Sequence, residues 1–202
     1  MIGKMFAIDR VRMGTDGPGI TTLVAMYQCP LNCEYCINNP IYKYREYSVK
    51  ELYNKVKIDA LYFEHTGGGI CFGGHEPLLQ QQFLIDFIKY VKEKGEQWKF
   101  GMETSLNAVI NSKLFELLDY VIADIKTVDC AIYEKYTEKS NKLVLRNLEK
   151  LNKYKNLDII IRLPMIPGYN DEKDIEKSKE YLRQIGYNEK QFDVFEYKSS
   201  IL

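Results

Sequence analysis

Hydrophobic residues along the chain gather in short runs that predict the strands of a buried sheet. The runs are rich in β-branched and aromatic residues, and each is bounded by polar segments or by glycine, which is typical of strands covered on both faces. The six predicted strands cover residues 21–29, 68–74, 98–104, 120–127, 157–165 and 192–198.

Between these runs, apolar residues recur at helical spacing. Ser48 and Glu51 have the spacing of a capping box, which predicts a helix that carries Leu52 and Val56 on one face. Three further helices are predicted from apolar spacing, acidic first turns and terminal glycines. Their marker residues are Leu79, Phe83, Phe87, Ile88, Val91 and Gly95 for the first, Leu145, Leu148 and Leu151 for the second, and Asp171, Asp174, Ile175, Leu182, Ile185 and Gly186 for the third.

Strands that alternate with helices predict an α/β fold with a parallel sheet, either doubly wound or an incomplete β/α barrel. In both architectures the carboxyl ends of the strands meet at one edge, where ligands bind. Chemically distinctive residues follow the predicted strands, so we expect one site, within a single domain over residues 1–202. The residues at this edge are Cys29 and those just after it, Gly73 to Pro77, Glu103, Thr104, Asp124, Lys126, Arg162 and Lys198.

Charge and hydrophobicity restrict the classes of partner. Lys plus Arg and Asp plus Glu both number 28, so the net charge is zero, without the basic excess of a nucleic-acid-binding protein. No apolar run approaches the roughly 18 residues of a membrane span, and residues 1–12 lack the apolar segment of a signal peptide. We expect a cytoplasmic protein with neither nucleic acid nor membrane as partner. Thiols are mostly reduced there, so clustered cysteines favour metal or redox chemistry.

Three of the five cysteines, Cys29, Cys33 and Cys36, lie within eight residues that begin at the last residue of the first predicted strand. A structural zinc ion usually takes four ligands in two separated pairs, and no second pair follows at such a spacing. An iron–sulfur cluster held by three thiolates, with one iron open to a substrate or cofactor, fits the triplet better. A zinc site completed by a distant residue and three unrelated reduced cysteines are the alternatives.

The triplet resembles the hallmark of the radical S-adenosylmethionine (SAM) superfamily, Cys-x3-Cys-x2-Cys with an aromatic residue before the last cysteine, here Tyr35. Other segments resemble the activating enzymes of glycyl-radical enzymes, of the pyruvate formate-lyase activating type. The resemblance covers about residues 6–198 and implies a partial (β/α)6 TIM-like barrel without a ferredoxin-like insertion. The segments are "TDGPGI" (15–20), Asn38, "GGGICFGGHEPLLQ" (67–80), "METS" (102–105), "ADIK" (123–126), "YEKYTEKSNKLVLRNLEKL" (133–151) and "IRLPMIPGYND" (161–171).

The resemblance implies reductive cleavage of SAM at a 4Fe-4S cluster, giving a 5′-deoxyadenosyl radical that abstracts a hydrogen atom. In the activating enzymes this hydrogen comes from a backbone glycine of a partner glycyl-radical enzyme. A flavodoxin or ferredoxin is the expected electron donor, and family members of this size are often monomers. Two alternatives remain: a radical SAM enzyme that modifies a small molecule or peptide, and a metal-binding regulatory protein without catalysis.

The resemblance also implies roles for individual residues. Cys29, Cys33 and Cys36 would be the thiolate ligands of the cluster, because thiolates favour soft iron centres. Gly73 and Gly74 would let the backbone approach the cofactor closely.

Polar residues at the next strand ends would hold the rest of the cofactor. Glu76 would accept hydrogen bonds from the cofactor ammonium group. Glu103, Thr104 and Asp124 could bind ribose hydroxyls or a monovalent cation. Lys126 would meet the cofactor carboxylate or balance these acids, and with Asp124 it forms the predicted catalytic pair. An Asp-x-Lys pair is also a common surface salt bridge, and glycines are common in turns.

Three positions depart from the family pattern. His75 stands where a second glycine is usual, and it can offer a polar contact or transfer a proton. Thr21 replaces a common arginine, and Lys198 replaces a common histidine. Tyr35, His75, Arg162 and Lys198 complete the predicted cofactor-binding set. Tyr35 is equally compatible with the core, and Arg162 with a structural ion pair.

Overall fold

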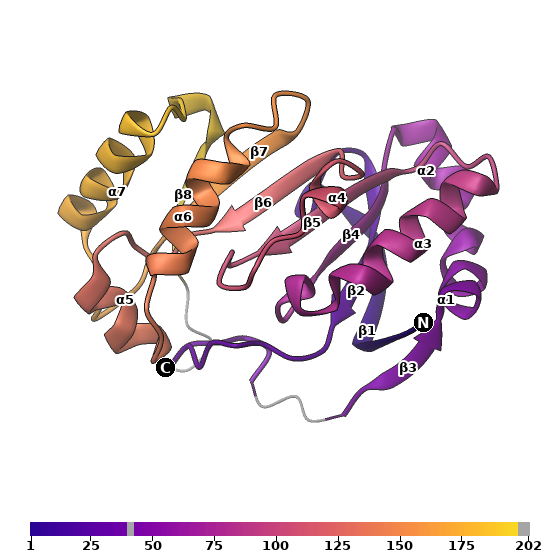
Figure 1. Ribbon diagram of the computed structural model, residues 1–202, viewed down its shortest axis with the longest axis horizontal. Helices are drawn as coiled ribbons and strands as arrows, with labels where there is room; N and C mark the ends of the chain where they lie inside the picture. Colours follow the sequence, from indigo (N-terminus) through magenta and orange to yellow (C-terminus); the bar gives the residue numbers. More distant parts are fainter. Residues whose placement is uncertain (40–42, 198–202) are drawn as a thin grey trace.

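A computed structural model of the chain describes residues 1–39 and 43–197 (Figure 1). Within these residues lies one sheet of eight strands in the order β3-β1-β2-β4-β5-β6-β7-β8. From β2 onward every neighbouring pair is parallel, whereas β1 pairs antiparallel with both β2 and β3. The strands are β1 (Ile2–Met13), β2 (Ile20–Met26), β3 (Arg45–Ser48), β4 (Gly69–Gly74), β5 (Lys99–Thr104), β6 (Tyr120–Asp124), β7 (Asp158–Met165) and β8 (Phe192–Glu196).

The six predicted strands are confirmed as the parallel strands, in the predicted order. Three of them end earlier than predicted. The strands β2 and β6 end at Met26 and Asp124, since the residues that follow turn into the site, and β8 ends at Glu196. The strands β1 and β3 were not predicted from the sequence. Much of β1 is exposed, and its register shifts between Asp9 and Arg12, so it has neither a buried-strand run nor a clean alternation.

The helices join successive parallel strands. The predicted capping box of Ser48 and Glu51 is confirmed, and the predicted helix start at Asp171 proves to be a second one: Ser48 and Asp171 each accept from the backbone N–H three residues on, and each backbone N–H receives the reciprocal bond. Leu79 was predicted on a buried helix face, which is wrong, because Pro77 opens a short 3-10 turn that leaves Leu79 45% exposed. The helical elements are α1 (Val49–Val56), η1 (Lys57–Asp59), α2 (Ala60–Thr66), η2 (Pro77–Gln80), α3 (Gln81–Glu93), α4 (Ser112–Phe115), α5 (Cys130–Thr137), α6 (Lys142–Leu151), α7 (Glu172–Gln184) and η3 (Glu189–Gln191).

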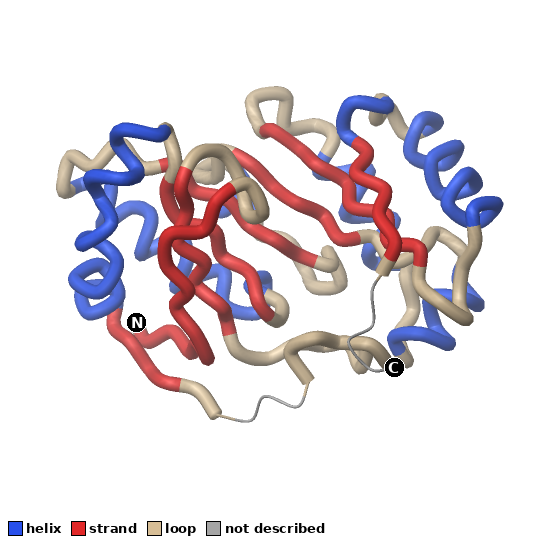
Figure 2. Tube along the Cα trace, turned by 180° about the vertical axis from the view of Figure 1, so that it is seen from behind, coloured by secondary structure: helices blue, strands red, loops and turns tan. Residues whose placement is uncertain are grey.

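Helices cover the outer face of the curved sheet (Figures 1 and 2), and the main core lies between these helices and the sheet. Phe72 and Phe100, from adjacent strands, both meet the ring of Phe87 in α3, with centroids 5.9 and 6.4 Å apart. Each such side chain contributes roughly 1.5–3 kcal/mol through burial. No helix among the described residues is both long and apolar enough to cross a membrane.

The inner face holds a much smaller apolar cluster around Tyr120. Its hydroxyl donates to the Asp16 carbonyl at 2.6 Å, which brings the β1–β2 turn against the inside of the sheet. Gly101 makes room for the ring, because a Cβ there would lie 1.9 Å from Tyr120. The turn therefore covers the inner face near the amino ends of the strands, and the carboxyl ends are left for the site.

Candidate functional site

The segment that carries the cysteine triplet leaves β2 and runs across the carboxyl edge of the sheet to α5 (Figure 1). The Asn32 N–H donates to the Thr137 carbonyl at 3.0 Å, and the Glu34 N–H donates to the Tyr136 carbonyl at 3.2 Å. We call residues 28–38 the cysteine loop, and these two bonds hold its middle. It therefore bridges two parts of the fold that are far apart in sequence.

All three predicted cluster ligands line one cavity of about 570 Å³, together with Asn38 and His75. Burial raises the pKa of the half-buried Cys33 to about 11, so a metal centre must displace its proton as it binds. Among the described residues, no three Cys, His, Asp or Glu side chains surround a single ion position. A 4Fe-4S cluster does not require a single shared ion position, because each thiolate binds a different iron. Three thiols that line one cavity therefore fit such a cluster.

The glycine-rich end of β4 lies beside this loop. Gly74 has a φ of +86°, and a Cβ there would lie 2.9 Å from Ala25, so both its conformation and its packing require glycine. The Asn38 amide donates to the Gly74 carbonyl at 2.8 Å. His75 lies on the same cavity as the thiols. The structure thus brings the predicted cofactor strand and the cysteine loop together.

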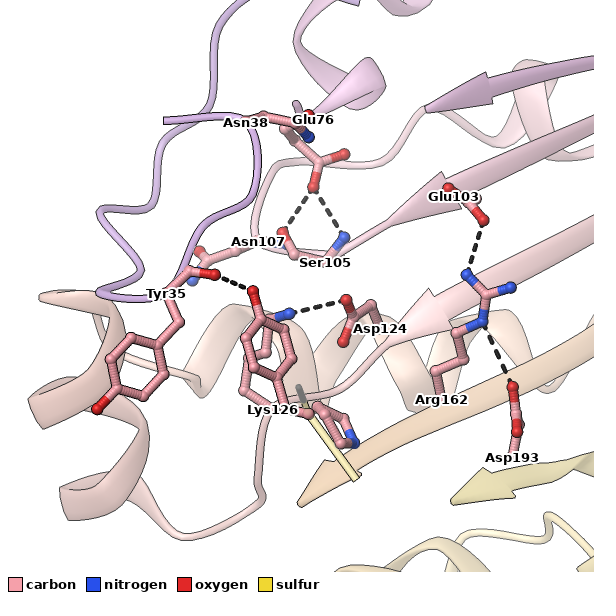
Figure 3. Close-up of polar contacts among 12 residues, drawn as sticks. Tyr35, Asn38, Glu76, Glu103, Ser105, Asn107, Asp124, Lys126, Arg162 and Asp193 are labelled. Carbon is pink, nitrogen blue, oxygen red and sulfur yellow. Dashed lines mark hydrogen bonds and ion pairs between the residues drawn. The ribbon is translucent and has the colours of Figure 1, made fainter. Parts of the chain in front are cut away.

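Glu76 is buried and its carboxylate is engaged by the protein itself (Figure 3). One oxygen accepts from the Leu78 N–H at 3.1 Å and the Thr104 hydroxyl at 2.6 Å. The other accepts from the N–H and hydroxyl of Ser105, at 3.0 and 2.6 Å. Burial raises the pKa of Glu76, and these donors oppose that rise. The predicted contact with the cofactor ammonium stays a prediction, and the geometry gives Glu76 and Thr104 a part in ordering the turn after β4.

Asp124 and Lys126 form a close pair at the end of β6, with Lys126 Nζ 2.7 Å from Asp124 Oδ2 (Figure 3). Burial alone would lower the pKa of Lys126, but the nearby Asp124 and Cys33 raise it above its ordinary value, so the amine stays cationic. The other oxygen, Asp124 Oδ1, is buried without a hydrogen-bond partner among the described residues. An unpartnered buried acceptor beside a buried cation is suited to a polar ligand.

Glu103 and Arg162 also pair, on the inner face of the sheet. Arg162 donates to Glu103 at 2.7 Å and to the Thr15 carbonyl at 2.5 Å, and its Nε lies 3.4 Å from Asp193 (Figure 3). Burial raises the pKa of Glu103, whereas Arg162 lowers it. Arg162 therefore links three strands to the β1–β2 turn, the structural pairing that sequence analysis left open. A second cavity, of about 440 Å³, lies beside it.

Tyr35 anchors the cysteine loop through an aromatic group. Its ring lies 6.1 Å from that of Tyr136, 6.0 Å from Tyr169 and 6.2 Å from Tyr197, and its carbonyl accepts a hydrogen bond from the Tyr197 hydroxyl (Figure 3). Tyr35 is half-buried and lies outside the apolar core, so these contacts give it a structural part in the loop, and a contact with the cofactor stays a prediction.

Some residues of this region were not predicted from the sequence. Ser105 follows the predicted Glu103–Thr104 pair directly, so its place at a strand end was the available signal. Nothing in the sequence marked Gln28 or Tyr197, whose partners lie far along the chain. The predicted residue Lys198 lies outside the described residues.

Comparisons with known proteins agree with this geometry. The family model "Radical SAM superfamily" matches residues 23–182. The pyruvate formate-lyase-activating enzyme of Staphylococcus aureus (strain USA300) is 32% identical over 199 residues, which cover 92% of this chain and 78% of that enzyme.

Two solved structures show the same fold at low sequence identity. Streptococcus suis SuiB bound to S-adenosylmethionine has a TM-score of 0.63 at 14% identity, over 89% of this chain and 39% of that one. The structure of anSMEcpe with bound AdoMet has a TM-score of 0.60 at 16% identity, over 83% of this chain and 48% of that one. This chain therefore spans less than half of either protein. Taken with the cysteine loop and the parallel β/α sheet, the comparisons show that the chain belongs to the radical SAM superfamily and is a radical SAM enzyme homologous to pyruvate formate-lyase-activating enzymes.

Proposed function

We propose that this chain activates a glycyl-radical enzyme by using SAM and a 4Fe-4S cluster to remove a hydrogen atom from a backbone glycine of that partner. The observation that carries the proposal is the convergence of Cys29, Cys33 and Cys36 on one cavity, in a chain 32% identical to an activating enzyme over 92% of its length. We also propose a cytoplasmic location, a monomeric chain, and a flavodoxin or ferredoxin as electron donor.

When bound, the cluster would supply one electron to SAM, which breaks its carbon–sulfur bond to give methionine and a 5′-deoxyadenosyl radical. The three cysteines would hold three irons and leave the fourth open.

The remaining side chains would bind and orient the cofactor. Lys126 is a buried cation, suited to a carboxylate, and Asp124 Oδ1 offers the free acceptor that a hydroxyl, an ammonium group or a monovalent cation needs. Glu103 is held in place by Arg162, so it can present its carboxylate in a fixed direction.

The first experiment asks whether the chain cleaves SAM. The protein is reconstituted anaerobically with iron and sulfide, reduced with dithionite and given SAM, and 5′-deoxyadenosine and methionine are measured by chromatography. Cys36→Ala should abolish both products. Cys130→Ala is the matched control, since Cys130 is exposed on α5, and it should behave as the unmodified protein. An inert cluster in the unmodified protein would contradict the proposal.

The second experiment asks where the hydrogen comes from. Pyruvate formate-lyase labelled with deuterated glycine is used as the probe partner. With the labelled partner we expect deuterium in 5′-deoxyadenosine, and with the unlabelled partner we expect the doublet electron paramagnetic resonance signal of a glycyl radical, which the one remaining α-hydrogen splits. If the label and the signal are absent with this and other glycyl-radical enzymes, the proposal of a glycyl-radical enzyme as partner is wrong. Sustained turnover of a small molecule or peptide would then identify the substrate class.

A further inference from the structure

His75 lies between the glycine-rich strand and the cysteine loop and contacts both ends of that loop. Its Nδ1 accepts from the Gln28 N–H at 3.2 Å, and its Nε2 lies 3.2 Å from the Asn38 carbonyl oxygen. A backbone N–H only donates and a carbonyl only accepts, so the neutral ring carries its proton on Nε2. One imidazole therefore joins residues 28 and 38, which flank all three cysteines.

The position of this ring is fixed by its neighbours. The ring of Phe6 packs against it with centroids 4.8 Å apart. The ring of Tyr27, directly before the cysteine loop, lies 5.9 Å from it between centroids. The Asn38 side chain returns a bond to the Gly74 carbonyl at 2.8 Å, so the loop and the turn after β4 are joined in both directions. Because packing already fixes the His75 side chain, its hydrogen bonds to the loop cost little further side-chain entropy.

Gln28 adds a second observation, because its backbone is strained. Its φ is +83°, in the left-handed region that residues other than glycine avoid. His75 accepts from its N–H, and the Glu76 N–H donates to its carbonyl at 3.0 Å. Both polar backbone groups of the strained residue are thus held by two consecutive residues, directly before Cys29.

We propose that His75 is a positioning residue that keeps the cysteine loop closed before the cluster is loaded and slows the loss of the cluster afterwards. A glycine at this position would offer neither bond, so Gln28 would relax and Cys29 would change direction. The part concerning the cluster rests on the proposed function. The part concerning the loop does not, since it depends only on the two bonds made by His75.

Four variants separate the two bonds and the strain. His75→Gly removes both bonds. His75→Asn keeps an acceptor near the Nδ1 position, and His75→Gln keeps a donor near the Nε2 position. Gln28→Gly removes the strain that His75 opposes. His65→Ala is the matched control, since the chain has only two histidines and His65 is exposed on α2.

Amide hydrogen exchange on the full metal-free chain tests the loop directly. In His75→Gly we expect the Gln28 amide to exchange about 3- to 10-fold faster, because it loses its acceptor, while amides of the β4–β6 ladder stay unchanged. His75→Asn should restore part of the protection, and His65→Ala should leave it unchanged. Unaltered exchange at Gln28 in His75→Gly would overturn the proposal, whether or not a cluster can be formed.

Release of iron to a chelator, followed by the loss of cluster absorbance, tests the second part. His75→Gly should release iron about tenfold faster than the unmodified protein, and the double variant with Gln28→Gly should recover much of the difference. Equal release rates in His75→Gly and the unmodified protein would refute the role in retention. Failure to form any cluster in the unmodified protein would instead refute the proposed function, and the amide result would still stand.

Discussion

The two faces of the sheet are filled in opposite ways. On the outer face, Phe72 and Phe100 are fully buried beneath Phe87 of α3, with other apolar side chains around them. On the inner face, Glu103 and Arg162 form an ion pair at 2.7 Å and remain partly exposed. Both arrangements come from the same strands, because successive side chains of a strand point to opposite faces.

This difference separates folding from chemistry. The outer face buries apolar area and so contributes most of the stability. The inner face and carboxyl edge hold polar groups in pairs, which cost stability when unpaired and can act on a ligand. Changes on the outer face should therefore unfold the protein, whereas changes on the inner face and the carboxyl edge should alter its activity.

The largest effect is expected from Phe87→Ala on the outer face. Loss of this fully buried ring should lower the free energy of unfolding by about 3–5 kcal/mol, through lost burial and the cavity left behind. Urea unfolding of the metal-free chain measures it. Leu61→Ala, at a side chain that is 64% exposed, is the control and should change stability by less than about 0.5 kcal/mol. Similar losses in both variants would contradict the assignment of the core.

Lys126→Met at the carboxyl edge should affect activity instead. Removal of a buried cation beside Asp124 should slow 5′-deoxyadenosine formation by about 10²–10³-fold, the usual cost of losing one electrostatic contact in an active site. Rates are compared at equal iron content and equal folded fraction. Lys177→Met removes an exposed lysine from its pair with Asp174 and should leave the rate unchanged. A rate within tenfold of normal for Lys126→Met would remove Lys126 from the site.

Asp59→Asn tests a polar group on the outer face, where Asp59 is fully buried and bonded to Arg10 and Thr22. Burial would raise its pKa, but these two partners lower it overall. The carboxylate therefore stabilises the fold above the unfolded pKa of about 4, and this contribution is lost as the pH falls through the lower folded pKa.

At pH 7 the Asp59→Asn variant should be less stable by about 1.5–3 kcal/mol, and this gap should narrow below about pH 4. Urea unfolding at several pH values measures the gap. Asp9→Asn, at an exposed carboxylate paired with Arg12, should cost less than about 1 kcal/mol. A gap for Asp59→Asn that is the same at acidic and neutral pH would show that the charge does not stabilise the fold.

The same contrast explains what sequence analysis could predict. Outer-face residues such as Phe72, Phe100 and Ile161 lie in continuous apolar runs, so the six parallel strands and their order were predictable. The edge where the site lies followed from the parallel order. The strand β1 could not be predicted from its sequence, because its charged residues pair with distant groups, for example Arg10 with Asp59.

Side-chain partners within the site depended on contacts between distant segments. Glu76 was predicted to face the cofactor, yet its acceptors are occupied by Thr104 and Ser105, which lie 28 and 29 residues away. His75 was predicted to bind the cofactor at a position that departs from the family pattern, and its two partners in the protein, Gln28 and Asn38, become visible only when the loop closes on β4. Local patterns predict which residue types reach the rim, but the pairing between them requires the folded chain.

The smallest effects come from two adjacent threonines on opposite faces of β2. Both are buried, but the Thr22 hydroxyl donates to Asp59 at 2.8 Å on the outer face, whereas Thr21 Oγ1, on the inner face, has no hydrogen-bond partner within residues 1–39 and 43–197. Thr21→Val should therefore raise the free energy of unfolding by about 1 kcal/mol, because it removes an unpaired buried hydroxyl. Thr22→Val should lower it by about 1–3 kcal/mol, because it leaves the Asp59 carboxylate short of a donor. The two substitutions are chemically the same and lie one position apart. Changes of opposite sign in the free energy of unfolding, measured with urea, would attribute the difference to the face of the sheet. Changes of the same sign would contradict the assignment of faces.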